Sequence, residues 1–161
     1  QAAAQQGLDV RIARPCNAYG PRASGGQNGQ VVAMMLERAA DGRALAVHGD
    51  GRQTRSFTWV GDVVDGLERL GRMDEAVDGS GPLAGLAFNF ASSVETSIAD
   101  LAVQISALTG AAVSEGQPGH PGDPRRRRPE VDTVKQRLGW EASTPLEDGL
   151  QRTWRALQDE R

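Results

Sequence analysis

The sequence is poor in the residues that would mark a secreted, membrane-bound or metal-binding protein. It has a single cysteine, Cys16, which excludes an internal disulfide and is compatible with a reducing cytoplasm. It has no apolar run of membrane-spanning length, so we expect no membrane partner. Its formal net charge of −3 argues against broad affinity for nucleic acid. Its two histidines, His48 and His120, have no neighbouring ligands, so we expect no metal site.

The residues that are present fit a globular domain in which helices and strands alternate. The chain of 161 residues is 39% apolar and 24% charged, which is ordinary for a soluble protein with one core. Strands are expected over residues 8–13, 44–48, 54–60 and 86–91, and helices over 28–41, 62–72, 98–109, 132–138 and from 146 onward. Residues 49–52 have the composition of a hairpin turn and residues 115–124 that of a loop. This order of elements favours an α/β architecture.

The first residues indicate that the chain begins inside a structural unit. Residues 1–6 are rich in helix formers, and Gly7 is the type of residue found just past a helix end. A strand pattern follows at once, as in the second half of a helix-to-strand unit. We therefore expect the chain to be a fragment or a truncated product with further sequence upstream.

Several conspicuous residues have structural interpretations alone. Asp62, Thr96 and Ser97 are of the types found at helix N-termini, and we interpret them as caps. Trp140 and Trp154 are interpreted as packing residues rather than ligand contacts. None of the five is assigned a chemical role.

Two stretches combine residues suited to holding a flat base and a diphosphate. The first is Asn17-Ala18-Tyr19-Gly20-Pro21-Arg22, and the second is Ala46-Val47-His48-Gly49-Asp50-Gly51-Arg52-Gln53-Thr54-Arg55-Ser56-Phe57. The Asn17 amide both donates and accepts hydrogen bonds, and the planar guanidinium of Arg55 can bind a diphosphate through two N–H groups. Taken singly, Asn17 could form a local turn, Tyr19 could belong to the core, and Arg55 could lie on the surface.

In this order the motifs resemble the substrate-binding half of nucleotide-sugar enzymes among the extended short-chain dehydrogenases/reductases. The closest resemblance is to UDP-glucuronate decarboxylases, also called UDP-xylose synthases, and it runs from about Gly7 to the end. It implies the late part of a Rossmann-type parallel sheet, interleaved with a small α/β substrate-binding lobe. Residues 1–16 and 86–110 would be the late Rossmann elements, and residues 17–85 and 111–161 mainly the lobe.

The resemblance also implies which residues contact the ligands. Substrate contacts would come from Asn17, the backbone of Ala46, Val47 and His48, and the side chains of Arg55 and Arg127. Pro15 and Cys16 would approach the nicotinamide of NAD, although Cys16 is equally well interpreted as a small buried filler. His48 stands where relatives often have an aromatic residue. Arg55 is also implied as a possible catalytic group in decarboxylation.

Residues 125–128 form a run of four arginines with two interpretations. Taken alone, such a run is a solvated patch or a site for an acidic partner such as nucleic acid. The flanking Pro129 and the later Leu138-Gly139-Trp140 resemble the terminal pattern of the family, in which one arginine reaches the nucleotide diphosphate. By that resemblance the arginine is Arg127, and we expect no nucleic-acid partner.

The implied chemistry starts with hydride transfer from the sugar to bound NAD, which gives a keto intermediate. Decarboxylation, epimerisation or dehydration follows, and the hydride is then returned. The family uses a Tyr-x-x-x-Lys pair and a glycine-rich strand-to-helix turn for this, and neither occurs in this sequence. We therefore expect NAD to be bound mainly by a missing N-terminal half, and this chain alone to be inactive.

The best expectation is the C-terminal part of a cytoplasmic, homodimeric UDP-glucuronate decarboxylase, a lyase acting on a UDP-sugar or another NDP-sugar. One alternative is a UDP-sugar 4-epimerase, an isomerase, because residues 95–98 and 121–123 resemble those of epimerases. An NDP-sugar 4,6-dehydratase of the same family is another. From a different class, the chain could be a non-catalytic remnant that still binds nucleotide sugars.

Overall fold

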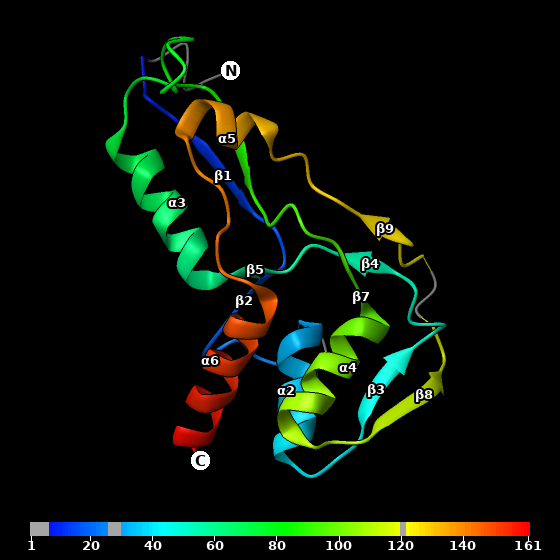
Figure 1. Ribbon diagram of the computed structural model, residues 1–161. Coiled ribbons are helices and arrows are strands. Elements are labelled where there is room, and N and C mark those ends of the chain that lie inside the picture. The colour runs from blue at the N-terminus through cyan, green and yellow to red at the C-terminus, as the bar shows by residue number, and fades with distance from the viewer. Residues whose placement is uncertain (1–6, 26–29, 120–121) are drawn as a thin grey trace.

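The computed structural model describes residues 7–25, 30–119 and 122–161. The helix expected over residues 1–6 and the loop residue His120 lie outside this part of the chain. Within it the helices and strands alternate as expected for an α/β protein, and the fold class is confirmed. Figure 1 shows an upper group of elements around β1 and α3, and a lower group around α2, α4 and β3.

The upper group is built on a parallel pair of strands. β1 (Ile12–Pro15) lies beside β6 (Ala87–Phe90), with Ile12 opposite Ala87 and Pro15 opposite Phe90. α3 (Val60–Arg72) and α5 (Asp132–Leu138) enclose a core that contains Leu70, Leu83, Phe88, Phe90, Val134, Leu138 and Trp140. Phe90 meets Trp140 edge to face, with ring centroids 5.0 Å apart. The pattern of residues 8–13 predicted a strand here, although the strand itself begins four residues later than expected.

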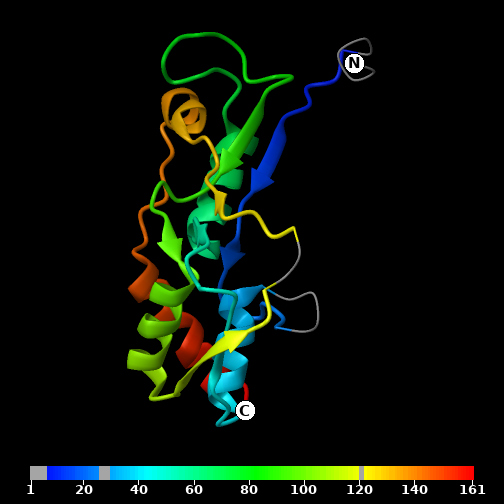
Figure 2. The ribbon, with the colours of Figure 1, turned by 90° about the vertical axis from the view of Figure 1, so that its right-hand side faces the viewer.

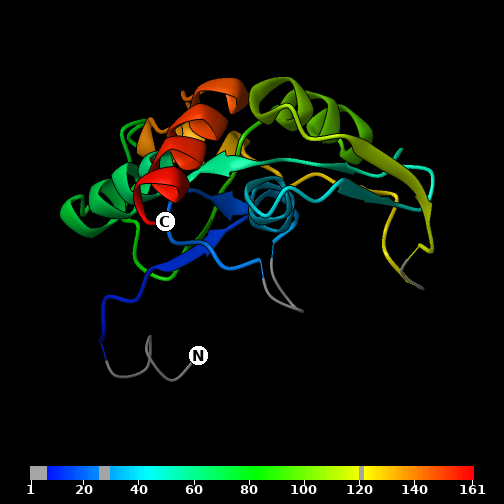
Figure 3. The ribbon, with the colours of Figure 1, turned by 90° about the horizontal axis from the view of Figure 1, so that it is seen from below.

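The lower group contains a second core between helices and another parallel pair. α2 (Val31–Ala40), α4 (Ile98–Thr109) and α6 (Leu146–Asp159) pack together, and Figure 3 shows α2 nearly end-on beside the other two. β3 (Leu45–His48) pairs with β8 (Val113–Gln117). The buried side chains include Tyr19, Val32, Met35, Leu36, Leu45, Val47, Leu101, Ile105 and Leu150.

Short strands run between the two groups. β2 (Ala18–Tyr19) pairs with β5 (Thr58–Trp59), and β4 (Thr54–Arg55) lies between β7 (Thr96–Ser97) and β9 (Arg126–Arg127). Viewed from the side, the molecule is elongated, with the upper and lower groups at opposite ends (Figure 2). The strand β4 therefore occupies the region where the two groups meet.

Asp62 joins the two groups through hydrogen bonds to the segment before α6. Its carboxylate accepts hydrogen bonds from the amides of Ser143 and Thr144 at 3.1 and 2.9 Å, and from the Thr144 hydroxyl at 2.8 Å. Its carbonyl accepts one from the Trp140 indole at 3.0 Å. The expectation that Asp62 caps α3 is wrong, because the N-cap of α3 is Trp59 and makes no side-chain cap bond. Asp62 instead holds the start of α6 against α3.

Other predictions about local structure divide between confirmed and wrong. Ser97 caps α4 by accepting the Asp100 amide at 3.0 Å, and α5 has the expected bounds. The hairpin predicted over residues 49–52 is wrong, because β3 pairs with β8 and β4 with β7 and β9. Residues 115–117 belong to β8 and not to a loop. The packing cores also cut across the residue ranges predicted for the two parts of the chain, and the assignment of those ranges stays a prediction.

Candidate functional site

A cavity of about 390 Å³ lies beside β3, β4 and α2. Its polar lining comes from Asn17, Gln30, Arg38, His48, Gln53, Arg55 and Asp123, and its apolar lining mainly from α2 and Phe57. A largely apolar cavity with a few convergent polar groups is the usual form of a small-molecule site. The volume is also within the range that such ligands occupy.

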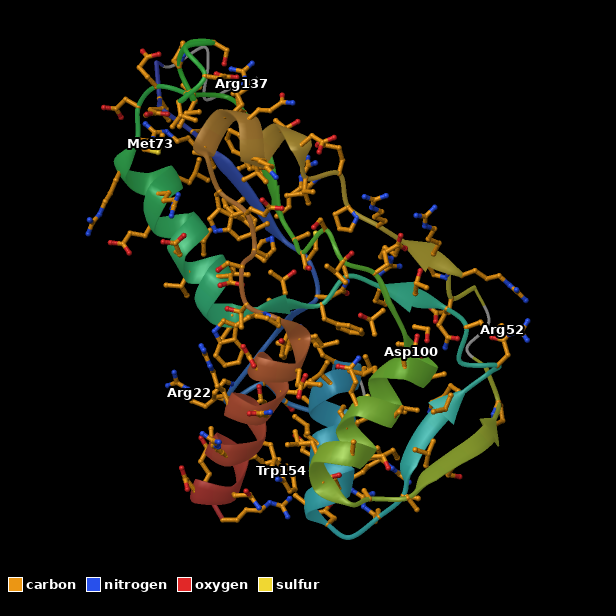
Figure 4. The ribbon with its side chains drawn as sticks, in the orientation of Figure 1. Arg22, Arg52, Met73, Asp100, Arg137 and Trp154 are labelled. Atoms are coloured by element: carbon orange, nitrogen blue, oxygen red, sulfur yellow. The ribbon has the colours of Figure 1, made fainter. Side chains whose placement is uncertain are left out.

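Arg55 on β4 brings a guanidinium to this cavity. The residue is only 8% exposed, which is unusual for an arginine and shows that it does not lie free on the surface. Nη1 donates to the carbonyl oxygens of Thr54 and Pro124 at 2.7 and 2.9 Å. Nη2 forms an ion pair with Asp123 from the segment before β9. Arg52, three positions earlier, is exposed at the outer tip of the turn between β3 and β4 (Figure 4).

Asn17 reaches the cavity from the turn between β1 and β2. Its φ of 44° is uncommon for a residue other than glycine, and asparagine is among the side chains that tolerate it best. The side-chain Nδ2 donates to the Ser56 carbonyl at 3.0 Å, and the Asn17 carbonyl accepts the Thr58 amide at 3.2 Å. These bonds fix the asparagine against the segment that follows Arg55, from Ser56 to Thr58.

The strand β3 presents alternate residues to the cavity. Ala46 and His48 line it, whereas the Val47 side chain points into the lower core and is 3% exposed. The carbonyl of His48 accepts a hydrogen bond from Gln53 Nε2 at 3.0 Å, and its ring Nδ1 lies 3.0 Å from the Pro118 carbonyl. Of the predicted substrate contacts, the structure therefore brings Asn17, Ala46, His48 and Arg55 to one cavity.

The arginine run contains a strand that the sequence did not predict. In β9, Arg127 is in parallel register with Arg55 and Arg126 with Thr54. The single N–H of Arg126 Nε is shared between the two oxygens of the Glu95 carboxylate, at 3.0 and 3.1 Å, and Nη2 donates to the same carboxylate at 2.5 Å. The Arg127 side chain is exposed and is not part of the cavity lining.

Glu95, which directly precedes β7, accepts hydrogen bonds from both β4 and β9 and so holds the two strands together. Hydrogen bonds from Arg126, and then from Thr54 at 2.8 Å, lower the pKa of Glu95 from its ordinary value of 4.5 to about 2. Arg125 makes a weaker ion pair, 4.0 Å from Asp50. The three arginines thus differ in surroundings, because Arg126 is fixed, Arg125 is loosely paired, and Arg127 is placed beside the backbone of Arg55.

Pro15 and Cys16 lie at the carboxyl end of β1 and are not among the residues that line the cavity. The amide of Cys16 donates to the Phe90 carbonyl at 3.0 Å, and its own carbonyl accepts the Thr58 hydroxyl at 3.0 Å. The thiol donates to the Arg14 carbonyl at 3.4 Å, and burial raises its pKa. The end of parallel strands is where ligands gather in open α/β sheets. The cofactor role of Pro15 and Cys16 stays a prediction.

The comparison with protein families matches residues 1–82. The matching sequence model is that of the NAD dependent epimerase/dehydratase family, and it covers about half of the chain. The chain belongs to this family. Membership confirms the resemblance recognised from the two motifs, both of which lie within the matched residues.

Curated proteins to which the chain is similar include UDP-glucuronic acid decarboxylases. One from Arabidopsis thaliana is 37% identical over 147 residues, which cover 91% of this chain and 40% of that relative. One from Xenopus tropicalis is 39% identical over 154 residues, which cover 92% of this chain and 33% of that relative. The chain therefore spans well under half the length of these relatives.

Solved members of the family have the same fold. The UDP-glucose 4-epimerase of Thermotoga maritima, solved with UDP-glucose, superposes with a TM-score of 0.86 at 28% identity. The superposition covers 98% of this chain and 48% of that chain. This likeness confirms the prediction of a Rossmann-type α/β protein.

Sequence reasoning missed four polar residues of the cavity, Gln30, Arg38, Gln53 and Asp123. Gln30 and Arg38 belong to a segment that was interpreted only as a helix. Gln53 lies inside the second motif, so its position could have suggested a role, whereas Asp123 follows a Gly/Pro-rich stretch that gives no sign of folding back onto Arg55. Among the described residues no group of three or more His, Cys, Asp and Glu side chains could hold a metal ion. In the same part of the chain no helix is both long and apolar enough to cross a membrane.

Proposed function

We propose that this chain forms the nucleotide-sugar-binding part of a UDP-glucuronate decarboxylase. The observation that carries the proposal is that residues from three separate segments line one cavity. Asn17 comes from the first motif, Ala46 and His48 from β3, and Arg55 from β4. The identity of 37–39% with UDP-glucuronic acid decarboxylases supports the choice of substrate class.

The proposal gives roles to Asn17, Arg55 and the strand β3 in the cavity, and to Arg127 beside it. The Arg55 guanidinium donates hydrogen bonds to the diphosphate, and the strand backbone next to Ala46 contacts the base. The Asn17 amide, fixed by its bond to the Ser56 carbonyl, donates to a phosphate or a sugar hydroxyl. Arg127 supplies a second cation from β9, next to Arg55 in register. A buried arginine held by two carbonyls is preorganised for such binding, because its geometry is fixed before the ligand arrives.

NAD is the cofactor of the family by its name, and when bound it supplies the acceptor for the substrate hydride. We propose that Pro15 and Cys16 are the contacts that this chain offers to it. The half-buried, uncharged thiol at the end of β1 fits an apolar contact with a ring better than a nucleophile. The sequence contains neither a glycine-rich strand-to-helix turn nor a Tyr-x-x-x-Lys pair, so we propose weak NAD binding and no turnover by the chain alone. For the whole enzyme we propose a cytoplasmic homodimer.

Calorimetric titration of UDP into the chain tests the proposal. Arg55→Ala should weaken UDP binding by about 1.5–3 kcal/mol, the scale of a hydrogen bond to a charged group. Arg55→Lys should recover only part of this loss, because an ammonium cannot reproduce the planar fork of donors. Arg52→Ala is the matched control, since Arg52 belongs to the same motif but is exposed at the tip of the turn.

Thermal unfolding of each variant separates a binding defect from a folding defect. Arg55→Ala leaves Asp123 without its cation, so some loss of stability is expected. If folded Arg55→Ala binds UDP as tightly as the wild-type protein does, the cavity is not the nucleotide-sugar site and the proposal fails.

A 4-epimerase is the second candidate, and one observation favours it. Asp123 belongs to a stretch that resembles epimerases, and it lies in the cavity beside Arg55. Affinities for UDP-glucuronate and UDP-glucose distinguish the two functions. A decarboxylase site should prefer the acidic sugar, whereas tighter binding of UDP-glucose would favour the epimerase.

A further inference from the structure

The Arg55 guanidinium already has an anion bound in this structure. A guanidinium has five N–H donors. Three of those of Arg55 are directed to the Thr54 carbonyl, the Pro124 carbonyl and the Asp123 carboxylate. The two carbonyls are uncharged and hold the side chain in place, whereas Asp123 is a carboxylate at the position that an anionic ligand would take.

The charges around the cavity make this pair important for an anion. Its charged lining residues, within the part of the chain that the structure describes, are Arg38, Arg55 and Asp123. Nε of Arg38 donates to the Ala44 carbonyl at 2.6 Å, so its charge is held beside the start of β3. Asp123 cancels the charge of Arg55 and would repel a diphosphate that approaches the same nitrogen atoms.

The two partners of this ion pair differ in their contact with water. The Arg55 side chain is 10% exposed and the Asp123 side chain 35% exposed. The carboxylate can therefore turn into solvent once the pair is broken, whereas the guanidinium stays fixed by its two carbonyls. The chain is anchored two residues later, where the Arg125 carbonyl accepts the Thr54 amide at 2.9 Å, so Asp123 can move without unpairing β9.

We propose that Asp123 is an internal counter-ion that competes with the diphosphate of the ligand for Arg55. The inference rests on the proposed function for the identity of the nucleotide, but the competition itself concerns any diphosphate. In the unliganded protein Asp123 neutralises a buried guanidinium, which would otherwise be left without an anion. In the complex the diphosphate replaces it and Asp123 faces water. Asp123 thereby lowers the affinity for the diphosphate, because the free energy of the ion pair between Asp123 and Arg55 must be given up when the ligand binds.

The test is titration of UDP, uridine and inorganic pyrophosphate into the wild-type chain, Asp123→Asn and a control variant. Asp123→Asn keeps the size and a hydrogen-bond acceptor but removes the charge. It should bind UDP and pyrophosphate roughly tenfold more tightly than wild type, since one competing charge has been removed. Uridine has no phosphate, so its affinity should not change. Asp50→Asn is the control, because Asp50 is an acidic residue near β9 that lies 4.0 Å from Arg125 and does not line the cavity.

The outcomes separate this inference from the proposed function. If Asp123→Asn binds UDP no better or less well than wild type, Asp123 supports Arg55 rather than competing with the ligand, and the inference is wrong while the proposed function stands. If UDP does not bind but pyrophosphate binds and tightens in the variant, the inference holds and the proposed function fails. An equal gain in Asp50→Asn would show a general effect of net charge and would also overturn the inference. Asp123→Ser serves as the second variant should Asp123→Asn not fold.

Discussion

Substitution of Gly149 by alanine is the most exacting test of how α6 packs on the first motif. A Cβ atom at this position would lie 2.0 Å from the hydroxyl oxygen of Tyr19 and 2.7 Å from its Cζ. Tyr19 cannot move aside freely, because it is 2% exposed and packs edge to face on Trp59 with centroids 5.8 Å apart. Its hydroxyl also donates to the Leu146 carbonyl at 3.3 Å, a bond that the displaced ring would lose.

The magnitude follows from three contributions. Overpacking of a filled core costs about 1–3 kcal/mol, and a lost hydrogen bond costs about 1 kcal/mol. Alanine returns up to about 1 kcal/mol over glycine within a helix. We therefore expect Gly149→Ala to lower the free energy of unfolding by about 1–3 kcal/mol, measured by urea denaturation with the slope of the transition compared between proteins.

Gly71→Ala is the matched control for this substitution. Gly71 is also helical, in α3, but a Cβ there has no heavy atom within 4 Å. The same change should leave stability unaltered or raise it by up to about 1 kcal/mol, because only the helix propensity changes. If both variants shift stability in the same direction, α6 does not pack on Tyr19 as described, and the reasoning is refuted.

Two further predictions concern the strand β9. Arg127→Ala should weaken UDP binding by about 1.5–3 kcal/mol, while Arg125→Ala should change it by less than about 1 kcal/mol. The measurement is a titration of UDP at low and high salt. Equal affinities for the two variants would show a diffuse charged surface instead. Acid should release β9, because the pKa of Glu95 is lowered to about 2 by its hydrogen bonds to Arg126 and Thr54. The stabilising effect of the Glu95 carboxylate is complete above its ordinary pKa of 4.5 and is lost as the pH falls towards 2. The wild-type protein should therefore lose more stability than Glu95→Gln between those pH values. An equal loss of stability in both proteins would contradict this.

Local patterns predicted those elements whose signals lie within a few residues. The Ser97 cap, the α5 helix and the strand at β6 all follow from neighbouring residues, and the structure has them close to the expected positions. Helix propensity, capping and apolar periodicity are short-range effects, so one sequence is enough to read them.

The errors arise where strands pair over long distances in the sequence. Glycines at 49 and 51 have the composition of a hairpin turn, yet β3 and β4 separate to pair with other partners. Gly51 is needed for packing as well, since its Cβ would lie 2.8 Å from Val47. The ion pair between Arg55 and Asp123 could not be predicted for the same reason, because nothing local to a Gly/Pro-rich stretch indicates which strand it will meet.

The candidate site was predicted only in part. One cavity brings together the motif residues Asn17, Ala46, His48 and Arg55. Tyr19 is buried in the core, which was one of its two interpretations from the sequence. Their roles toward a nucleotide sugar remain predictions that the UDP titrations decide.

The distribution of the cavity along the chain has a consequence for the order of folding. Its lining runs from Asn17 to Asp123, and the strand beside Arg55 is contributed by residues 126 and 127. Contacts between residues so far apart in the sequence form slowly, because the entropy of closing a long loop is lost before any contact stabilises the closed form. During synthesis on a ribosome, the lining of the cavity is therefore incomplete until the last quarter of the chain has emerged. A nucleotide present during synthesis should bind only the finished product, and it should then slow the unfolding of the segments that closed last.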